Sequence, residues 1–498
     1  MLTAAIFIPI LAAALLALLP RSRGLGASPR ALAVAATIVA VVPLVLVAAA
    51  WLRFDGASGF QQVETVPWIP TLGISYRVGV DGLSLPLAAM TALVFTVAVA
   101  YPVDLRGRPV PYYALILFLE GASVGVFLAL DLFLFFVFWD VSLVAMYFLI
   151  GAWGHGDAQR SALKFFLYTF AGSLPLLLAI LGVYLATDPH TFDMAEIIRQ
   201  QPLAGGGVYA ALVFAGFFAG FAIKTPIVPF HTWLPPAHVD APGPASAILA
   251  GVLLKMGTYG FVRILMSMVP GVWAELSLPL AVLAVVSIVY GALVALAQTN
   301  LKRLIAYTSV NHMGYVILGL AVAGAAAPGQ EAARALALTG ATVEMVAHGL
   351  ITGGLFLVSG SVLARGGTYD LDSYGGLLGR ARSLTWITAL LAFASLGLPG
   401  LAGFVAEVQI FVGALAVYPA LAAVALLGIV ITAGLFLRML GRLFLGALPD
   451  RWREFPDLGR REAGLLGVLG ALVLLIGVVP GWLLGTIDAF AGPFVGRP

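Results

Sequence analysis

FAIKTPIVPFHTWLPPAHVDAPGPASAILAGVLLKMGTYGFVR, residues 221–263, joins two long apolar runs through a proline-rich break. Lys224 stands at the end of the first run and Lys255 lies inside the second. The break between them contains six prolines and three polar titratable residues, His231, His238 and Asp240. A lysine inside hydrocarbon costs roughly 2.5–3.5 kcal/mol on insertion scales, so two lysines at apolar positions require a reason.

The choice of lysine at these two positions is itself informative. The chain contains four lysines against 22 arginines, so arginine supplies almost every other positive charge. Arginine stays protonated in proteins, whereas a buried lysine can release its proton. We therefore interpret Lys224 and Lys255 as proton-exchanging groups. The alternative is that each lysine only pairs structurally or reaches the membrane surface, a helix-end behaviour that the mid-run position of Lys255 does not favour.

The composition indicates a polytopic membrane protein. Of the 498 residues, 61% are hydrophobic and 10% are charged, and the mean hydropathy is +1.05. The net charge of +3 reflects loop arginines that face an anionic inner leaflet, and it gives no indication of nucleic-acid binding. The absence of cysteine excludes thiolate-ligated iron–sulfur clusters, disulfides and thiol catalysis in this chain. The N-terminus is apolar from Leu2 and has no basic start or cleavage site, so we expect a first span and not a signal peptide.

Apolar runs of about 20 residues, the length that crosses ~30 Å of hydrocarbon, recur along the chain. We place them near residues 2–20, 31–52, 82–100, 111–130, 132–153, 163–186, 207–230, 243–268, 277–297, 301–324, 335–363, 383–417, 420–445 and 463–487. The twelfth run is long and is interrupted at 398–400. We therefore expect an all-α polytopic membrane protein with about 14 transmembrane helices, in which helices 7 and 12 are discontinuous.

The basic residues alternate from loop to loop, as the positive-inside rule requires. If the first loop is cytoplasmic, the cytoplasmic loops hold seventeen of the 26 basic residues: Arg21, Arg23, Arg30, Arg106, Arg108, Arg160, Lys164, Lys302, Arg303, Arg365, Arg380, Arg382, Arg442, Arg451, Arg453, Arg460 and Arg461. Six lie in outer segments: Arg53, Arg77, Arg199, Arg263, Arg334 and Arg497. This pattern predicts a multi-pass protein of the bacterial inner membrane with both termini outside. No loop is long enough for a soluble catalytic domain, so any chemistry is expected within the membrane.

Two carboxylates lie in the middle of predicted spans four and five. Asp140, in DLFLFFVFWDVSLVAMYFLI, has Lys224 as an available partner of opposite charge. Each of these two groups favours the charged form of the other, so we predict an intramembrane ion pair. Glu120, in YYALILFLEGASVGVFL, is a further candidate, and its alternative is a protonated carboxylate without a role.

The proline breaks suggest an internal repeat. Pro226 and Pro229 follow Lys224, and Pro399 precedes Glu407. Proline interrupts the helical hydrogen-bond ladder, and interrupted spans in corresponding positions of two halves indicate inverted repeats with ion sites near the midplane. We expect four regions: three helices in 1–110, two proton-translocating five-helix repeats in 111–268 and 277–445, and a loop with the last helix in 446–498.

Two histidines in predicted spans can titrate near neutral pH. They are His312, in TSVNHMGYV, and His348, in EMVAHGL. Glu344 precedes His348 by about one helical turn, so we expect both on the same helix face. For either histidine, packing is the alternative to a role in proton transfer. Metal binding is not expected, because no two histidines have ligand spacing.

Six segments carry a resemblance to a known family: FLFFVFWDVSLVAMYFLIGAWG, ALKFFLYTFAGS, FHTWLPPAH, ILAGVLLKMGTYGFVR, LKRLIAYTSVNHMGYV and GLPGLAGFVAEVQIFVG. In this order, over roughly residues 80–445, they resemble the antiporter-like membrane subunits of respiratory complex I, and in particular the M subunit or chain 4. The resemblance implies a fourteen-helix fold with two inverted five-helix repeats. It implies that Asp140 is the span-five carboxylate and Lys224 its span-seven lysine partner. It also implies that Lys255 is the central lysine of span eight, Glu120 the glutamate of span four and Glu407 the exit residue of span twelve.

Single positions refine this resemblance. Glutamate at Glu407 resembles the M subunit, since the L and N subunits and the multi-subunit cation/proton antiporters usually carry lysine there. Asp140 stands where glutamate is usual and is one methylene shorter, so we expect a bridging water or a longer separation from Lys224. Pro236 replaces an aspartate of the family pattern, and Glu344 stands where glutamine is common.

The resemblance implies a proton-translocating membrane subunit of an NADH:quinone oxidoreductase, which takes part in the enzyme as a non-redox subunit. It implies no cofactor in this chain, with NADH, flavin, iron–sulfur clusters and quinone in partner subunits. The expected partners are antiporter-like and quinone-proximal membrane subunits and membrane lipids, and not nucleic acid. The alternatives are a subunit of a cation/proton antiporter, or of a hydrogenase- or ferredoxin-linked proton-pumping complex. A scaffold that has lost pumping is disfavoured, because the key positions remain ionisable.

Overall fold

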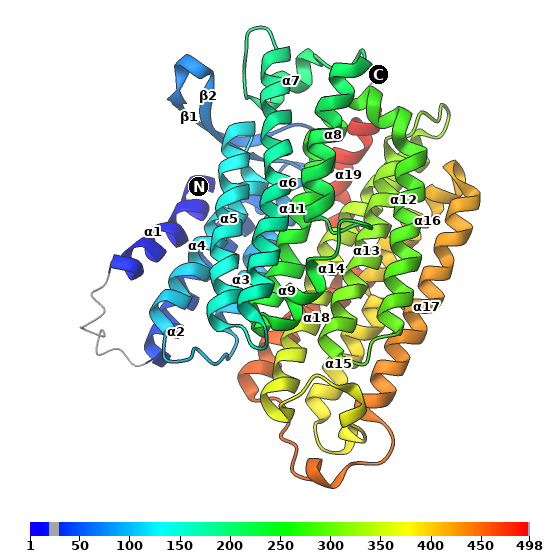
Figure 1. Ribbon diagram of the computed structural model, residues 1–498. Helices are drawn as coiled ribbons and strands as arrows, with labels where there is room; N and C mark the ends of the chain where they lie inside the picture. The colour runs from blue at the N-terminus through cyan, green and yellow to red at the C-terminus, as the bar shows by residue number, and fades with distance from the viewer. Residues whose placement is uncertain (19–28, 497–498) are drawn as a thin grey trace.

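The computed structural model describes residues 1–18 and 29–496, and it consists almost entirely of helices (Figure 1). The elements of the N-terminal half are α1 (Leu2–Leu18), α2 (Pro29–Leu52), β1 (Gln61–Ile69), β2 (Ile74–Val80), α3 (Ser84–Ala100), α4 (Pro109–Leu128), α5 (Leu132–Trp153), α6 (Ala158–Ala186), α7 (Met194–Gln200), α8 (Gly207–Lys224), α9 (Leu234–Asp240), α10 (Gly243–Ile248) and α11 (Leu254–Gly260). The remaining elements are α12 (Pro270–Leu296), α13 (Leu301–Ala323), α14 (Glu331–Gly366), α15 (Arg382–Ser395), α16 (Ala402–Val417), α17 (Pro419–Phe444), α18 (Arg460–Val478) and α19 (Gly481–Val495).

Every predicted apolar run contains helix. Among the described residues, eleven helices are long and apolar enough to cross a membrane, and the shorter apolar helices α1, α3 and α16 occupy three further runs. The expected all-α membrane class is therefore confirmed, whereas fourteen crossings, the two inverted repeats and the four regional boundaries stay predictions. Residues 19–20 of the first run, Arg21 and Arg23 of the first loop, and Arg497 lie outside the described residues.

The predicted discontinuities in spans seven and twelve are present. α8 ends at Lys224, and the chain is irregular until α9 begins at Leu234. α15 ends at Ser395 and α16 begins at Ala402, with Gly397 and Gly400 at φ +76° and +91° between them. Glycine adopts this left-handed conformation without steric cost, so these two glycines allow the chain to leave the helix at the second break.

Two boundaries differ from the prediction. The last run, 463–487, was expected to be one helix, but α18 ends at Val478 and α19 begins at Gly481. Pro480 disfavours a helical conformation of the preceding residue, and Val479 has φ −130° and ψ 67°. The segment 53–81 was expected to be a loop, but it contains the antiparallel hairpin β1–β2, with Val66 opposite Tyr76.

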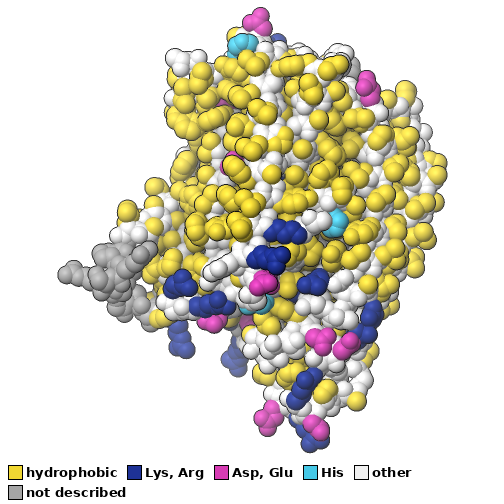
Figure 2. Space-filling model, in the orientation of Figure 1, with side chains coloured by type: hydrophobic (Ala, Val, Ile, Leu, Met, Phe, Trp, Pro, Cys, Tyr) yellow, Lys and Arg dark blue, Asp and Glu magenta, His cyan; other side chains and the backbone are white. Residues whose placement is uncertain are grey.

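The centre of the protein is formed by three buried helical segments. Residues 243–266 are entirely buried, α13 is nearly so, and the 36-residue α14 is buried over most of its length. Around them the surface is a broad hydrophobic belt, and the basic side chains gather towards the lower end of the face shown in Figure 2. The β1–β2 hairpin and α7 lie at the opposite end (Figure 1). Polar groups in the middle of these three segments are therefore shielded from solvent by protein.

Candidate functional site

Lys255 lies at the centre of the buried core. The helix from 243 to 266 is not uniform, because Leu249–Leu253 and Phe261–Met266 form π-helical turns on either side of α11. Such turns interrupt the regular hydrogen-bond ladder and are frequent at functional sites. The Lys255 side chain is fully buried, and its Nζ donates to the carbonyl oxygen of Ala250 in the first π turn at 2.5 Å. The local fold thus holds the lysine without a counter-charge in direct contact.

His348 of α14 is the second partner of Lys255. Its Nδ1 lies 2.5 Å from Nζ, while its Nε2 has no hydrogen-bond partner among the described residues. If Lys255 is an ammonium, Nδ1 of His348 accepts and the imidazole proton resides on Nε2. Two bases in this contact can share one proton, which is the arrangement that proton transfer between them requires.

His312 and Glu344 continue this line of buried groups. The rings of His312 and His348 are 5.4 Å apart, and Nε2 of His312 is 2.9 Å from the Ser395 hydroxyl at the end of α15. Glu344 Oε1 lies 3.2 Å from Nδ1 of His312, within ion-pair range but not aligned as a hydrogen bond. Glu344 and His348 line the same small cavity, which confirms that they share a helix face.

Glu407 lies beyond this cluster, across the break between α15 and α16. It is buried, and it is close enough to Glu344 for the two carboxylates to interact electrostatically. A methyl group on Gly397 would overlap the Glu407 carboxylate, so this side chain folds back over the break. Glu407 is the sixth residue of α16, beyond the four amides that lack a helical partner, and no hydrogen bond from the first turn reaches it in the described structure. The alternative to proton exchange at Glu407, a structural glutamate that caps the second half-helix, therefore receives no support.

Asp140 and Lys224 interact electrostatically without a direct contact. Lys224 ends α8 and is buried, and its Nζ has no hydrogen-bond partner in the described part of the chain. Nζ instead lies 4.8 Å from the centre of the Trp139 ring, within the range of a cation–π interaction. Asp140 is half-buried on α5, beside Ser173. The two groups form no direct ion pair in the described part of the chain, so the predicted intramembrane ion pair stays a prediction.

The end of α8 packs closely against α11. A methyl group on Gly257 would lie 2.9 Å from the carbonyl oxygen of Phe221 and from the amide nitrogen of Thr225. Lys224 and Lys255 are therefore carried by two segments whose backbones touch, although neither lysine contacts the other directly. The arrangement places both lysines of the predicted relay in one buried region.

Glu120 is not brought to the other predicted residues. It lies on α4, fully buried, and neither carboxylate oxygen has a hydrogen-bond partner among residues 1–18 and 29–496. The neighbouring Gly121 packs against the backbone of α1 at Ile6. The role of Glu120 in proton transfer stays a prediction.

Lys302 and His238 are buried titratable residues that were not among the predicted site residues. Lys302, predicted in a cytoplasmic loop, is fully buried, with Nζ 2.5 Å from the carbonyl oxygen of Ala241. The error arises because Asn300 caps α13 by accepting from the Arg303 amide, which places Lys302 in the first helical turn. His238 is fully buried in α9. The signal for Lys302 was the scarcity of lysine in the chain, and the signal for His238 was its position in the proline-rich break of span seven.

Comparisons with known proteins show which family the chain belongs to. The family described as "NADH:quinone oxidoreductase/Mrp antiporter, TM" matches residues 129–432. The chain belongs to this family. It is 39% identical over 490 residues to NADH-quinone oxidoreductase subunit M of Rhodobacter capsulatus, covering 95% of this chain and 92% of that protein. It is 38% identical over 501 residues to NAD(P)H-quinone oxidoreductase chain 4 1 of Nostoc sp. (strain PCC 7120 / SAG 25.82 / UTEX 2576), covering 98% and 90%.

A solved structure extends the agreement to the fold. A chain of respiratory complex I from Thermus thermophilus with bound NADH matches all of this chain and all of its own length, with a TM-score of 0.87 and 30% sequence identity. The resemblance to an antiporter-like membrane subunit of complex I, of the M or chain 4 type, is therefore confirmed. The predicted site residues from Asp140 to Glu407 lie within the matched range, and Glu120 lies shortly before it.

Proposed function

We propose that this chain is a proton-translocating membrane subunit of an NADH:quinone oxidoreductase. It binds no redox cofactor, so NADH, flavin, iron–sulfur clusters and quinone belong to partner subunits. Its partners are antiporter-like and quinone-proximal membrane subunits and the surrounding lipids. The observation that carries the proposal is the buried line of exchangeable groups that begins with the contact between Lys255 and His348 and continues to Glu407.

Each residue of the line has a distinct role in the proposed path. Lys255 holds a proton and passes it to Nδ1 of His348, whose Nε2 can release another. His312 and Glu344 receive it, and Glu407 delivers it to the outer side. His312, Glu344 and His348 line a small cavity, and the proposed transfer along the line involves side-chain motion or a transient opening. The proposed path is therefore not continuously open and conducts protons only when these side chains move.

Asp140 and Lys224 couple the path to the rest of the complex. Two opposite charges in a low-dielectric region interact strongly, and their energy changes steeply with separation. A neighbouring subunit that moves Asp140 or its surroundings changes the charge state favoured by Lys224, and this in turn acts on Lys255 across the contact of α8 with α11. Electron transfer in the partner subunits can thereby drive protons through this chain. Glu120 is proposed as a further ionisable group of the chain that acts apart from this line, since it contacts none of the line's residues in the described structure.

We propose that the chain lies in the bacterial inner membrane with both termini outside. The clustering of basic side chains at the lower end of Figure 2 supports this orientation, because positive residues favour the cytoplasmic face. A hairpin and α7 at the other end then face the outside (Figure 1).

A subunit of a cation/proton antiporter is the second candidate, because the matched family includes the Mrp antiporters. The first test is to purify the complex through this chain and identify its partner subunits. Redox subunits support the proposed oxidoreductase, and antiporter subunits alone contradict it.

The second test concerns proton transfer itself. Lys255→Arg keeps the positive charge but cannot release a proton. We expect proteoliposomes with the variant complex to lose most NADH-driven proton uptake, while Lys164→Arg, at an exposed lysine, leaves it unchanged. Proton uptake at the full rate in Lys255→Arg would contradict a proton-carrying role for Lys255.

A further inference from the structure

Trp139, on α5, is a partner of Lys224 that the proposed function does not use. Its ring is buried, and the ammonium nitrogen Nζ of Lys224 lies 4.8 Å from the centre of the ring. Nζ has no hydrogen-bond partner in the described part of the chain. The face of an aromatic ring carries negative electrostatic potential, and a cation gains most from it where water is excluded. The ring therefore stabilises the ammonium without help from Asp140.

Three contacts hold the Trp139 ring in this position. Its Nε1 donates to the hydroxyl of Ser173 on α6 at 3.1 Å. Phe135 and Phe221, both fully buried, pack against it with ring centres 5.6 and 5.7 Å away. A ring fixed by a hydrogen bond and by packing needs no rearrangement to receive an ammonium, so it binds better than a mobile ring. Trp139 thus forms a preorganised cation site inside the protein.

The end of α8 favours an ammonium at the same place. Lys224 is the last residue of α8, and the final carbonyl groups of a helix carry the negative end of its dipole. This contribution and that of the Trp139 ring do not involve Asp140. The lysine can therefore stay charged while it makes no direct contact with the carboxylate.

Trp139 and Asp140 offer Nζ two different positions. They are neighbours in the sequence of α5, so their side chains leave the helix in directions about 100° apart. The flexible four-carbon stem of lysine allows Nζ to approach either of them. In the described structure Nζ takes the ring, and Oδ1 of Asp140 has no hydrogen-bond partner.

We infer that Trp139 is a positioning residue that competes with Asp140 for Lys224, so that the lysine alternates between the ring and the carboxylate. The inference rests on the proposed function. With Nζ on the ring, the charge of Asp140 is free to respond to a neighbouring subunit. With Nζ on Asp140, the ion pair is closed. No covalent bond changes, because the ammonium moves as a whole. Without the ring, the closed pair has no competitor, and the response of Lys224 is lost.

Fluorinated tryptophans test this role without a large change in the shape of the side chain. Each fluorine withdraws electron density from the ring face and weakens cation binding, while the packing and the N–H donor remain. Tryptophans of increasing fluorine content are introduced at Trp139 by nonsense suppression, and the whole complex is purified. We expect the most fluorinated ring to shift the distribution of Nζ about ten-fold towards Asp140 in a structure of the complex. NADH-driven proton pumping in proteoliposomes is expected to fall in the order of fluorine content.

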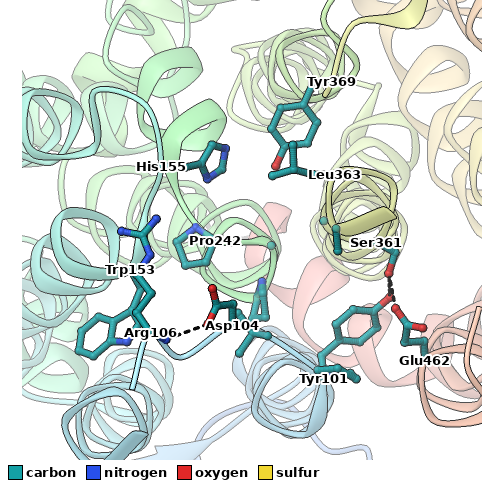
Figure 3. Close-up of a pocket in the computed structure, with 16 residues that line it drawn as sticks. Tyr101, Asp104, Arg106, Trp153, His155, Pro242, Ser361, Leu363, Tyr369 and Glu462 are labelled. Atoms are coloured by element: carbon teal, nitrogen blue, oxygen red, sulfur yellow. Dashed lines mark hydrogen bonds between the residues drawn. The ribbon is translucent and has the colours of Figure 1, made fainter. Parts of the chain in front are cut away.

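Trp153 is the matched control on the same helix. It is buried, its Nε1 donates to the carbonyl oxygen of Leu105 at 3.0 Å, and the guanidinium carbon of the exposed Arg108 lies 6.0 Å from its ring centre. The ring lines a pocket of about 440 Å³, remote in sequence from Lys224 (Figure 3). Arginine keeps its proton in proteins, so fluorination here weakens a cation–π contact that exchanges no proton. We expect pumping to be unchanged.

Substitutions give a second comparison. Trp139→Leu and Phe135→Leu each replace a buried aromatic ring of α5 by an aliphatic side chain, but among the described residues no cation lies over the Phe135 ring. We expect Trp139→Leu to assemble and to pump about five-fold more slowly than Phe135→Leu. Asp140→Glu alone leaves the ring in place as a competitor. Adding Trp139→Leu to it is expected to abolish the pumping that Asp140→Glu retains.

The outcomes separate this inference from the proposed function. If Nζ stays on the most fluorinated ring, or if that complex pumps at the wild-type rate, the role of Trp139 is overturned. The proposed function then still stands, provided that Lys255→Arg loses pumping. If Lys255→Arg pumps normally, the proposed function is contradicted, and the position of Nζ in the fluorinated complex decides the inference alone. If the fluorinated chain does not assemble, equal pumping by Trp139→Leu and Phe135→Leu overturns the inference.

Discussion

Nζ of Lys255 lies 2.5 Å from Nδ1 of His348, a residue 93 positions further along the chain. The contact joins a helix interrupted by π turns to the long buried helix α14. Nζ of Lys255 also donates to the carbonyl oxygen of Ala250. The proton between Nζ and Nδ1 of His348 is therefore the one that can move from one residue to the other. The protonation state of Lys255 and His348 determines whether His312 and Glu344 can receive a proton from them.

His348→Gln tests this contact. Glutamine can still accept from Lys255, but it cannot take up and release a proton. We therefore expect assembly to be retained and NADH-driven proton pumping in proteoliposomes to fall about ten-fold or more. His190→Gln, at an exposed histidine, is the control and is expected to have no effect. Pumping by His348→Gln at the control rate would show that His348 is a packing residue.

Asp140→Glu tests the separation from Lys224. The added methylene lets the carboxylate approach Nζ, which now has no hydrogen-bond partner in the described part of the chain. We expect a direct ion pair in a structure of the variant, with pumping retained. Asp140→Asn removes the charge and is expected to reduce pumping several-fold while the complex still assembles. Asp157→Asn, at an exposed loop position, is the control, and equal pumping by both asparagine variants would remove Asp140 from the mechanism.

The parts of this site that were predictable are those with a local cause. Pro226 and Pro399 lie at the two helix breaks, and proline favours such a break because it removes a backbone donor. Proline alone does not decide it, since Pro43 and Pro175 lie inside continuous helices. Glu344 and His348 were placed on one face by helical spacing alone. Lys255 was conspicuous because arginine supplies nearly all of the other positive charge in the chain.

The parts that were not predictable depend on tertiary packing. Lys302 was counted with Arg303 among the residues of a cytoplasmic loop, and only the fold shows that Lys302 is buried and Arg303 is exposed. The position of the Lys224 ammonium over Trp139 depends on side-chain rotamers, which sequence spacing does not determine. The contact of Lys255 with His348 joins two helices whose relative register no local pattern specifies.

Gly397→Ala tests the coupling between the second break and Glu407. Gly397 has φ +76°, and an added methyl group would overlap the Glu407 carboxylate. We expect a loss of stability of about 1–3 kcal/mol from backbone strain and, in addition, a marked loss of pumping as the carboxylate is displaced. Gly400→Ala is the matched control, because its φ is +91° but nothing lies within 4 Å of the added methyl. Thermal unfolding and pumping of the two variants separate strain from displacement, and equal pumping would contradict the coupling.

Glu407 is the group on which the outward end of the proposed path depends. It is buried beyond the break, interacts with Glu344, and receives no hydrogen bond from the first turn of α16 in the described structure. Glu407→Gln keeps the shape and most hydrogen bonding but cannot carry a proton, so we expect it to assemble and to lose most pumping and coupled quinone reduction. Glu407→Lys restores an exchangeable proton with the opposite charge and is expected to regain part of the activity. Gln409→Glu, two residues away, adds a carboxyl group on another face of the same helix and serves as the control for added charge. Full pumping by Glu407→Gln would show that the proton leaves by another residue, and an equal loss in the glutamine and lysine variants would show that the position requires a carboxylate for its structure and not for proton exchange.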